Sequence, residues 1–244
     1  MKIALIGYGK MGKAIEAIAK DEGDEIVLTI TSENKKDFTI ENIRKADVAI
    51  EFTNPQSAVE NIKKCLDAHV PVVCGTTGWL KEFDYIKEYC AKANGAFLYA
   101  SNFSIGVNLF FALNEYLATL MSTHSEYDVC IEEIHHTQKK DAPSGTAITL
   151  AEQLLQQIKT KKNWVNNNAA NSSELEILSE RTGDVPGTHK VKYTSSTDDI
   201  EITHAAHNRT GFASGALLAA KFLINKKGIF TMQDVLAIPS TSTL

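Results

Sequence analysis

The sequence predicts an α/β protein with a parallel, helix-covered sheet in its first part and an α+β second part with a mixed sheet. Three observations lead to this fold class. Up to about residue 102, short apolar strand patterns alternate with amphipathic helix patterns. A glycine-rich turn joins the first strand pattern to the first helix pattern. Beyond residue 103, long apolar helix patterns and strands separated by polar turns replace this alternation.

Five strand patterns and three helix patterns make up the first part. We expect the strands at residues 2–6, 25–31, 46–53, 70–74 and 96–100. We expect the helices at residues 11–20, 56–68 and 79–94. Because helices separate most of these strands, the connections are crossovers, and the sheet is parallel with helices on both faces.

The second part begins and ends with apolar helix patterns. Helices are expected at residues 105–121, 144–159 and 212–225. Strands are expected at residues 127–134, 174–180, 190–195 and 200–206, in a mixed or antiparallel sheet. The polar segment 164–173 is rich in Asn, Ala and Ser, and we expect an exposed, mobile loop there.

The composition excludes several classes of protein. Of 244 residues, 43% are hydrophobic and 23% are charged, which is too apolar for a disordered chain. The net charge of −5 gives no bulk attraction for nucleic acid or an anionic membrane, so we expect neither as a partner. The four cysteines form no CxxC pair, which is typical of reduced thiols in a cytoplasmic protein.

A glycine motif indicates a nucleotide site at the first strand–helix junction. The first glycine permits a tight turn, the second lets the backbone approach a pyrophosphate, and the third lets helix and strand pack closely. Glycines in such a turn can be purely structural, but the strand before and the helix after favour a Rossmann-type, dinucleotide-binding domain. The predicted cofactor-binding residues are Gly7, Tyr8, Gly9, Lys10, Met11 and Gly12.

The cofactor is expected to be NADH or NADPH. Glu33 follows the second strand pattern, where an acidic residue accepts hydrogen bonds from the ribose of NAD. Lys35 and Lys36 follow at once and could pair with the 2′-phosphate of NADP. A solvated charged turn is the alternative interpretation, and the choice between the two cofactors stays open.

Two further segments follow strand patterns, at the sheet edge where open α/β sheets bind ligands. Turn chemistry alone could also explain them. Their positions favour cofactor contacts, which we assign to Gly75, Thr76, Thr77, Ala100, Ser101, Asn102 and Phe103.

Ionisable residues are densest between Glu132 and Ala147. A metal site is not expected there, because His135 and His136 are adjacent on a strand and point to opposite faces. The helical HxxxH spacing of zinc enzymes is also missing. His204 and His207 are interpreted as surface or core packing.

An anion site is the better interpretation of this segment. Ser144 stands where a helix N-cap belongs, and Gly145 and Thr146 would offer free N–H groups to a carboxylate. Cationic and titratable side chains lie just upstream, at His135, His136, Lys139 and Lys140. An ordinary capped helix after a charged loop is the alternative.

These residues resemble a known family. The run EIHHTQKKDAPSGTA at 133–147 closely resembles the E-x-H-H-x-x-K-x-D-A-P-S-G-T-A signature of the dihydrodipicolinate (4-hydroxy-tetrahydrodipicolinate) reductases. Supporting segments are EFT at 51–53, GTTG at 75–78, NFSIGVN at 102–108 and GIFTMQDVL at 228–236. The resemblance covers essentially the whole chain.

The resemblance implies two domains and one reaction. Residues 1–104 and 210–244 would form the dinucleotide-binding domain, and residues 105–209 the substrate-binding and tetramerisation domain. NAD(P)H would reduce the dicarboxylate 4-hydroxy-tetrahydrodipicolinate to tetrahydrodipicolinate with release of water, in the diaminopimelate route to lysine. The family pattern is a homotetramer.

The resemblance also implies residue roles. His135 takes the position of a proton donor or acceptor, and Lys139 that of a proton donor. The substrate carboxylates would be held by His136, Ser144, Gly145, Thr146 and Arg209. Lys10 replaces the family's usual arginine in a glycine loop one residue shorter, Glu51 replaces an aspartate, and Asn34 stands where many relatives carry a basic residue. The alternatives are another two-domain NAD(P)-dependent oxidoreductase and a non-catalytic nucleotide sensor.

Overall fold

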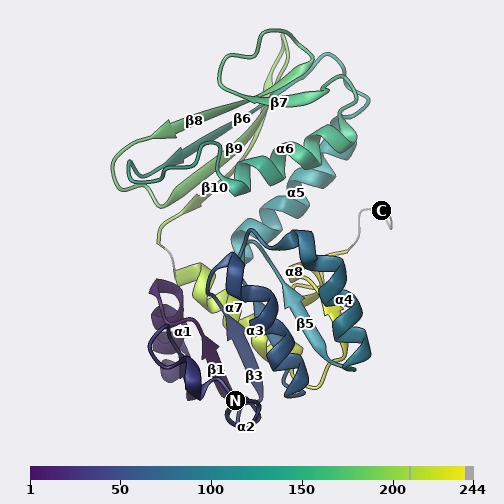
Figure 1. The fold of residues 1–244 in the computed structure, drawn as a ribbon. Coiled ribbons are helices and arrows are strands. Elements are labelled where there is room, and N and C mark those ends of the chain that lie inside the picture. Colours follow the sequence, from purple (N-terminus) through teal and green to yellow (C-terminus); the bar gives the residue numbers. More distant parts are fainter. Residues whose placement is uncertain (209, 240–244) are drawn as a thin grey trace. The chain divides into compact units, whose positions relative to one another are not determined.

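The computed structural model describes residues 1–208 and 210–239 and divides into two compact units. The first unit comprises Met1–Ile105 and Thr210–Ile238, and the second includes Gly106–Arg209. Figure 1 shows helices and strands alternating in the first unit, and a sheet with two long helices in the second. The predicted fold class is confirmed.

The first unit contains a six-stranded parallel sheet in the order β11-β5-β4-β3-β1-β2. Its strands are β1 (Lys2–Ile6), β2 (Glu25–Ile30), β3 (Val48–Glu51), β4 (Val72–Cys74), β5 (Ala96–Tyr99) and β11 (Gly228–Phe230). All residues of β3 and β4 are buried, as expected where helices cover both faces. Strand β11, from the far end of the chain, pairs with β5 and completes the sheet.

Two layers of helices cover this sheet. Side chains of α3 (Pro55–Asp67) and α4 (Phe83–Lys92) form one apolar core with the sheet. Side chains of α1 (Lys10–Asp21) and α7 (Thr210–Leu223) form the core on the other face. The short elements are η1 (Lys35–Asp37), α2 (Ile40–Ile43), η2 (Leu80–Glu82) and α8 (Met232–Val235).

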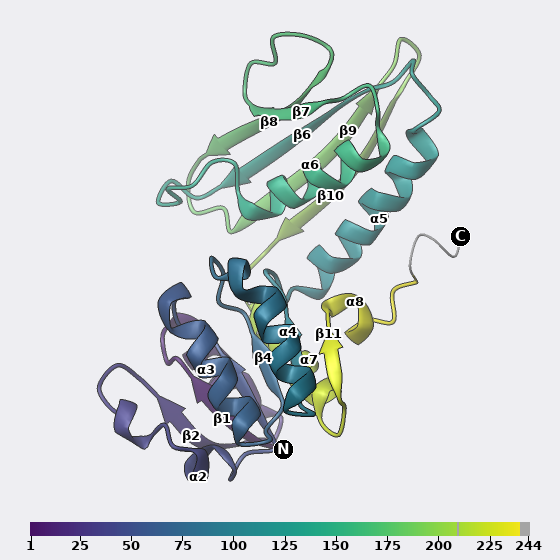
Figure 2. The ribbon, with the colours of Figure 1, turned by 45° about the vertical axis from the view of Figure 1, so that its right-hand side comes forward.

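The second unit contains a five-stranded mixed sheet in the order β10-β9-β6-β8-β7. Its strands are β6 (Asp128–His135), β7 (Asn163–Asn166), β8 (Glu174–Arg181), β9 (Gly187–Thr194) and β10 (Asp199–Ala206). Strand β6 is antiparallel to β9 and parallel to β8. The helices α5 (Ile105–Met121) and α6 (Gly145–Gln157) form one apolar core with this sheet (Figure 2).

The prediction of a loop at residues 164–173 is wrong for the first part of this segment. Residues Asn163–Asn166 form the edge strand β7, which pairs in parallel with β8. The composition is polar, but Trp164 is half-buried and packs against the core of the unit. The packing of Trp164 and the pairing with β8 both favour a strand here.

No helix among the described residues is long and apolar enough to cross a membrane. The four cysteines are free thiols, three of them buried and Cys130 half-buried. Most predicted elements match the observed ones to within a few residues. The larger differences are at α4, which begins at Phe83, four residues after the predicted start, and at β9, which begins at Gly187, three residues before its predicted start.

Candidate active site

The turn between β1 and α1 has the geometry that the glycine motif requires. Gly7 has a φ of +97°, and a Cβ there would lie 2.0 Å from the Phe52 carbonyl oxygen. A Cβ on Gly12 would lie 2.4 Å from the carbonyl oxygen of Gly7, so the helix packs closely on the turn. Gly9, the N-cap of α1, faces open space instead. The first turn of α1 holds no acidic residue, and its N–H groups therefore suit a phosphate.

A pocket of about 370 Å³ lies beside this turn in the first unit. Its lining combines the glycine turn with the loops that follow β3 and β4: Gly9, Lys10, Met11, Phe52, Thr53, Pro55, Gly75, Thr76 and Thr77. The backbone N–H of Thr53 donates to Thr76 Oγ1 over 2.8 Å and joins the two loops. Six predicted cofactor residues thus meet in one pocket. Phe52, Thr53 and Pro55 were not predicted, although they follow the third strand pattern as the other loops follow theirs.

The remaining predicted cofactor residues lie around this framework. The hydroxyl of Tyr8 donates to the Glu16 carboxylate on α1. The ring of Phe103 is buried, with its centroid 5.6 Å from that of Phe52, which lines the pocket. Before Phe103, Ala100 is buried, Ser101 is exposed, and Asn102 Oδ1 accepts from the Ser104 N–H over 2.9 Å.

Glu33 is exposed just beyond the end of β2, at the predicted place. Next to it, the Asn34 side chain accepts from the Thr31 N–H over 2.7 Å and donates to the Thr29 carbonyl over 2.9 Å. The amide of Asn34 is therefore engaged in shaping the loop. Exposed charge remains on both sides of it, from Glu33 and from Lys35 and Lys36.

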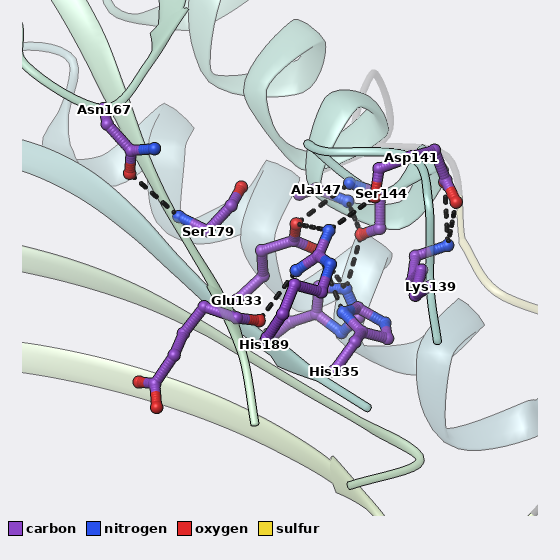
Figure 3. Close-up of polar contacts among 11 residues, drawn as sticks. Glu133, His135, Lys139, Asp141, Ser144, Ala147, Asn167, Ser179 and His189 are labelled. Atoms are coloured by element: carbon purple, nitrogen blue, oxygen red, sulfur yellow. Dashed lines mark hydrogen bonds and ion pairs between the residues drawn. The ribbon is translucent and has the colours of Figure 1, made fainter. Parts of the chain in front are cut away.

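In the second unit, the buried face of the sheet changes from apolar to ionisable toward one end. Along β6 the inward positions are Val129, Ile131, Glu133 and His135. The register places His189 of β9 and Ser179 of β8 opposite Glu133, and Arg181 of β8 opposite His135. Three neighbouring strands thus bring their polar inward residues to one place (Figure 3).

The carboxylate of Glu133 is fully buried at the centre of this cluster. Its Oε1 accepts from Arg181 Nη2 over 2.8 Å and from the backbone N–H of Ser144 over 3.1 Å. Its Oε2 lies 3.1 Å from His135 Nδ1. Burial alone would raise the pKa of Glu133, but the contact with His135 and the hydrogen bonds from Ser144 and Arg181 outweigh it and hold the pKa well below its ordinary value.

His189 is buried beside Glu133 and stays neutral. Burial, with His135 nearby, lowers the pKa of His189 to about 3. Its Nε2 lies 3.0 Å from the Ser144 hydroxyl and 3.8 Å from Glu133 Oε2. Ligand atoms of Glu133, His135 and His189 lie within 4.8 Å of one another, as in a metal site. Because the Arg181 guanidinium already neutralises Glu133, we interpret the group as a carboxylate–histidine cluster.

The predicted helix N-terminus lies next to the cluster. Ser144 is the N-cap of α6, and its hydroxyl accepts from the Ala147 N–H over 3.2 Å. Gly145 is exposed, with open space where its Cβ would stand, and Thr146 is half-buried. No acidic residue occupies the first turn, so these N–H groups remain suited to a carboxylate.

Lys139 lies on the loop between β6 and α6, and its ammonium group contacts both carboxylate oxygens of Asp141 (Figure 3). This ion pair holds the pKa of Asp141 below its ordinary value. His136 follows β6 and is half-buried, whereas Lys140 is exposed. Arg209, predicted as a carboxylate clamp, lies outside the described residues.

No role was predicted for Glu133, Arg181 or His189. Glu133 could have been found, because it stands two residues before His135 and so shares its face of the strand. Arg181 and His189 become visible only through the pairing of β8 and β9 with β6.

The fold and the two groups of residues define a two-unit oxidoreductase with a nucleotide-binding domain. Residues 1–103 match the family model "Dihydrodipicolinate reductase, N-terminus", and residues 106–236 match "Dihydrodipicolinate reductase, C-terminus". The chain belongs to the dihydrodipicolinate reductase family, and the family predicted from the sequence motifs is confirmed.

Curated relatives agree with this family over nearly the whole chain. A 4-hydroxy-tetrahydrodipicolinate reductase of Christiangramia forsetii is 51% identical, over 97% of this chain and 98% of the relative. One of Bdellovibrio bacteriovorus is 38% identical, over 97% and 96%. A dipicolinate-bound dihydrodipicolinate reductase of a Paenisporosarcina species has the same fold, with a TM-score of 0.76, 23% identity and coverage of 95% and 97%.

Proposed function

We propose that this chain reduces 4-hydroxy-tetrahydrodipicolinate to tetrahydrodipicolinate with release of water, and that the residues below carry the reaction. This is the activity predicted from the sequence, a step of the diaminopimelate route to lysine, and relatives at 51% and 38% identity have the corresponding name. The observation that carries the residue assignment is the buried Glu133–His135 pair beside the free N-terminus of α6.

A nicotinamide cofactor is held by the first unit. The N–H groups at the start of α1 would bind the pyrophosphate, where Gly9 leaves the space open and Lys10 adds a positive charge. Gly75, Thr76 and Thr77 line the same pocket and would receive the nicotinamide end. NADH and NADPH are both proposed, since Glu33 favours the ribose hydroxyls of NADH and Lys35 and Lys36 favour the phosphate of NADPH.

The substrate is a dicarboxylate, and it would bind in the second unit. The N–H groups of Gly145 and Thr146, positioned by Ser144, would accept one carboxylate, with His136 and Arg209 as further contacts. When bound, the reduced nicotinamide supplies the hydride. Water forms as the bond from the ring to its 4-hydroxyl and a neighbouring ring C–H bond break, with His135 taking the ring proton and passing it to the departing hydroxide. Lys139 donates the proton that accompanies the hydride, while the helix N–H groups stabilise the negative charge. The balance consumes one NAD(P)H and one proton and releases one water.

The test is a coupled assay. The substrate is generated in situ by the preceding synthase, and absorbance at 340 nm is followed with NADH and with NADPH in parallel. We expect cofactor consumption that depends on both the synthase and this protein. Lack of consumption with either cofactor would refute the proposal, and the ratio of the two rates gives the cofactor preference.

Assembly and location are further proposals. We propose a homotetramer in the cytoplasm, in keeping with the family pattern and the free thiols. Size-exclusion chromatography with light scattering tests the assembly: a mass near four times 26.8 kDa is expected, and a monomer would contradict it.

A further inference from the structure

Glu133 contacts both the start of helix α6 and the ring of His135. Through Oε1 it accepts from the backbone N–H of Ser144, the residue that begins the anion-binding helix end. Through Oε2 it faces the ring of His135 at 3.1 Å. The Arg181 guanidinium anchors Oε1 from a third direction. One buried carboxylate therefore joins the helix N-terminus to the histidine (Figure 3).

We propose that Glu133 is a positioning residue, which holds His135 in the tautomer with its hydrogen on Nδ1 and so leaves Nε2 for proton exchange. This inference rests on the proposed function, which gives His135 its proton-transfer role. An ionised carboxylate accepts hydrogen bonds and cannot donate them, so at 3.1 Å it favours the tautomer whose hydrogen is on the nearer ring nitrogen, Nδ1. A neutral imidazole then has its lone pair on the other nitrogen.

The Nε2 side of His135 lies close to the backbone of β9. The start of β9 passes there with a glycine, and a Cβ on Gly187 would lie 3.0 Å from Nε2. A larger residue at this position would crowd the nitrogen that the proposal assigns to proton exchange. His189 also packs against His135, and their ring centroids lie 5.0 Å apart in an edge-on arrangement. Because the His189 ring is neutral, it does not compete with His135 for the negative charge of Glu133.

The substitution Glu133→Gln separates positioning from folding. The Gln side chain has the same shape, and its carbonyl oxygen would stay toward the two donors Arg181 and Ser144. Its NH₂ group would then face His135 Nδ1, which must accept, and the ring hydrogen would move to Nε2. We expect kcat to fall by about 100-fold, as for a catalytic histidine held in the wrong tautomer or left without its orienting partner. KM for the substrate should change by less than about threefold, because the helix N-terminus is unaltered.

Two variants calibrate this result. Glu132→Gln makes the same change one residue away on the opposite face, where Glu132 pairs with Lys190 at 3.1 Å, and should leave kcat unchanged. Glu133→Asp keeps the charge and should restore part of the activity. Wild-type kcat in Glu133→Gln, or a change in KM alone, would overturn the proposal.

The tautomer can also be measured without any variant. In ¹⁵N NMR spectra of the wild-type protein with labelled histidine, we expect Nδ1 of the neutral His135 ring to carry the hydrogen. A hydrogen on Nε2 would overturn the proposal. This readout does not depend on turnover: an inactive wild-type protein would refute the proposed function, while the spectrum would still decide the tautomer.

Discussion

The ammonium group of Lys139 lies 2.8 and 2.7 Å from the two carboxylate oxygens of Asp141. The proposed proton donor is thus held by a partner two residues away on the same loop. Asp141 is largely exposed, so this ion pair contributes no more than about 1 kcal/mol and can be exchanged for contacts with a substrate. Lys139 is positioned near the site without being fixed there.

Replacing this lysine should affect chemistry more than folding. In Lys139→Ala we expect kcat to fall by about 100-fold or more, because general acid catalysis accelerates a reaction by a factor of about that size. The exposed neighbour Lys140 is the matched control, and Lys140→Ala should retain nearly full turnover. Steady-state kinetics in the coupled assay measure both, and near-normal turnover in Lys139→Ala would exclude it as the proton donor.

The N-cap of α6 should contribute to stability and to substrate binding together. Ser144→Ala removes the hydrogen bond to the Ala147 N–H and should cost about 1 kcal/mol in free energy of unfolding. It should also raise KM for the substrate. Asn54 caps α3 in the first unit through the Ser57 N–H, so Asn54→Ala should cost similar stability without raising that KM. An equal effect of both substitutions on KM would argue against a carboxylate site at α6.

Two glycines of the same turn should respond differently to a methyl group. Gly12→Ala places a Cβ 2.4 Å from the Gly7 carbonyl oxygen and should lower the melting temperature strongly. Gly9→Ala meets open space and should fold normally, but its methyl would occupy room that the pyrophosphate needs. Melting curves and cofactor titrations distinguish the two. If Gly9→Ala bound NADH and NADPH as tightly as the wild type, the pyrophosphate would have to lie elsewhere.

The buried neutral His189 should make the protein sensitive to mild acid. Its pKa is about 3 in the folded protein against an ordinary 6.5, so between these values the unfolded chain binds a proton that the folded chain does not. The free energy of unfolding should therefore fall as the pH decreases below about 6.5. Urea titrations between pH 7 and 5 should show a shallower fall in His189→Gln. The exposed His124 is the control, and a slope unchanged in His189→Gln but altered in His124→Gln would contradict this account.

Much of the fold could be predicted because its signals are local. The helix predicted at residues 105–121 is observed with those bounds, and Ser144 caps the next helix as its residue type indicated. The tight turn at Gly7 and the close packing at Gly12 were predicted from the glycine spacing between a strand pattern and a helix pattern, and close backbone contacts are found at both. The strand β7 was missed because Trp164 gains its order from packing against the core, which a polar composition does not reveal.

The site was less predictable because it depends on strand pairing. The motif around His135 placed the candidate site at the end of β6 and the loop after it, and the alternation along β6 places Glu133 on the same face as His135. Arg181 and His189 lie 46 and 54 residues further along the chain from His135 and reach it only through the register of β8 and β9. The residues next to Arg181 and His189 in the sequence do not indicate that both side chains lie beside one buried carboxylate.

The proposed hydride transfer can be followed directly with an isotope. NADH or NADPH deuterated at the transferred position of the nicotinamide is supplied with the substrate made in situ, and the product is analysed by mass spectrometry and NMR. We expect tetrahydrodipicolinate with one deuterium on a ring carbon, formed in step with oxidised cofactor. Cofactor oxidation that leaves no deuterium in the product would contradict the proposed hydride transfer.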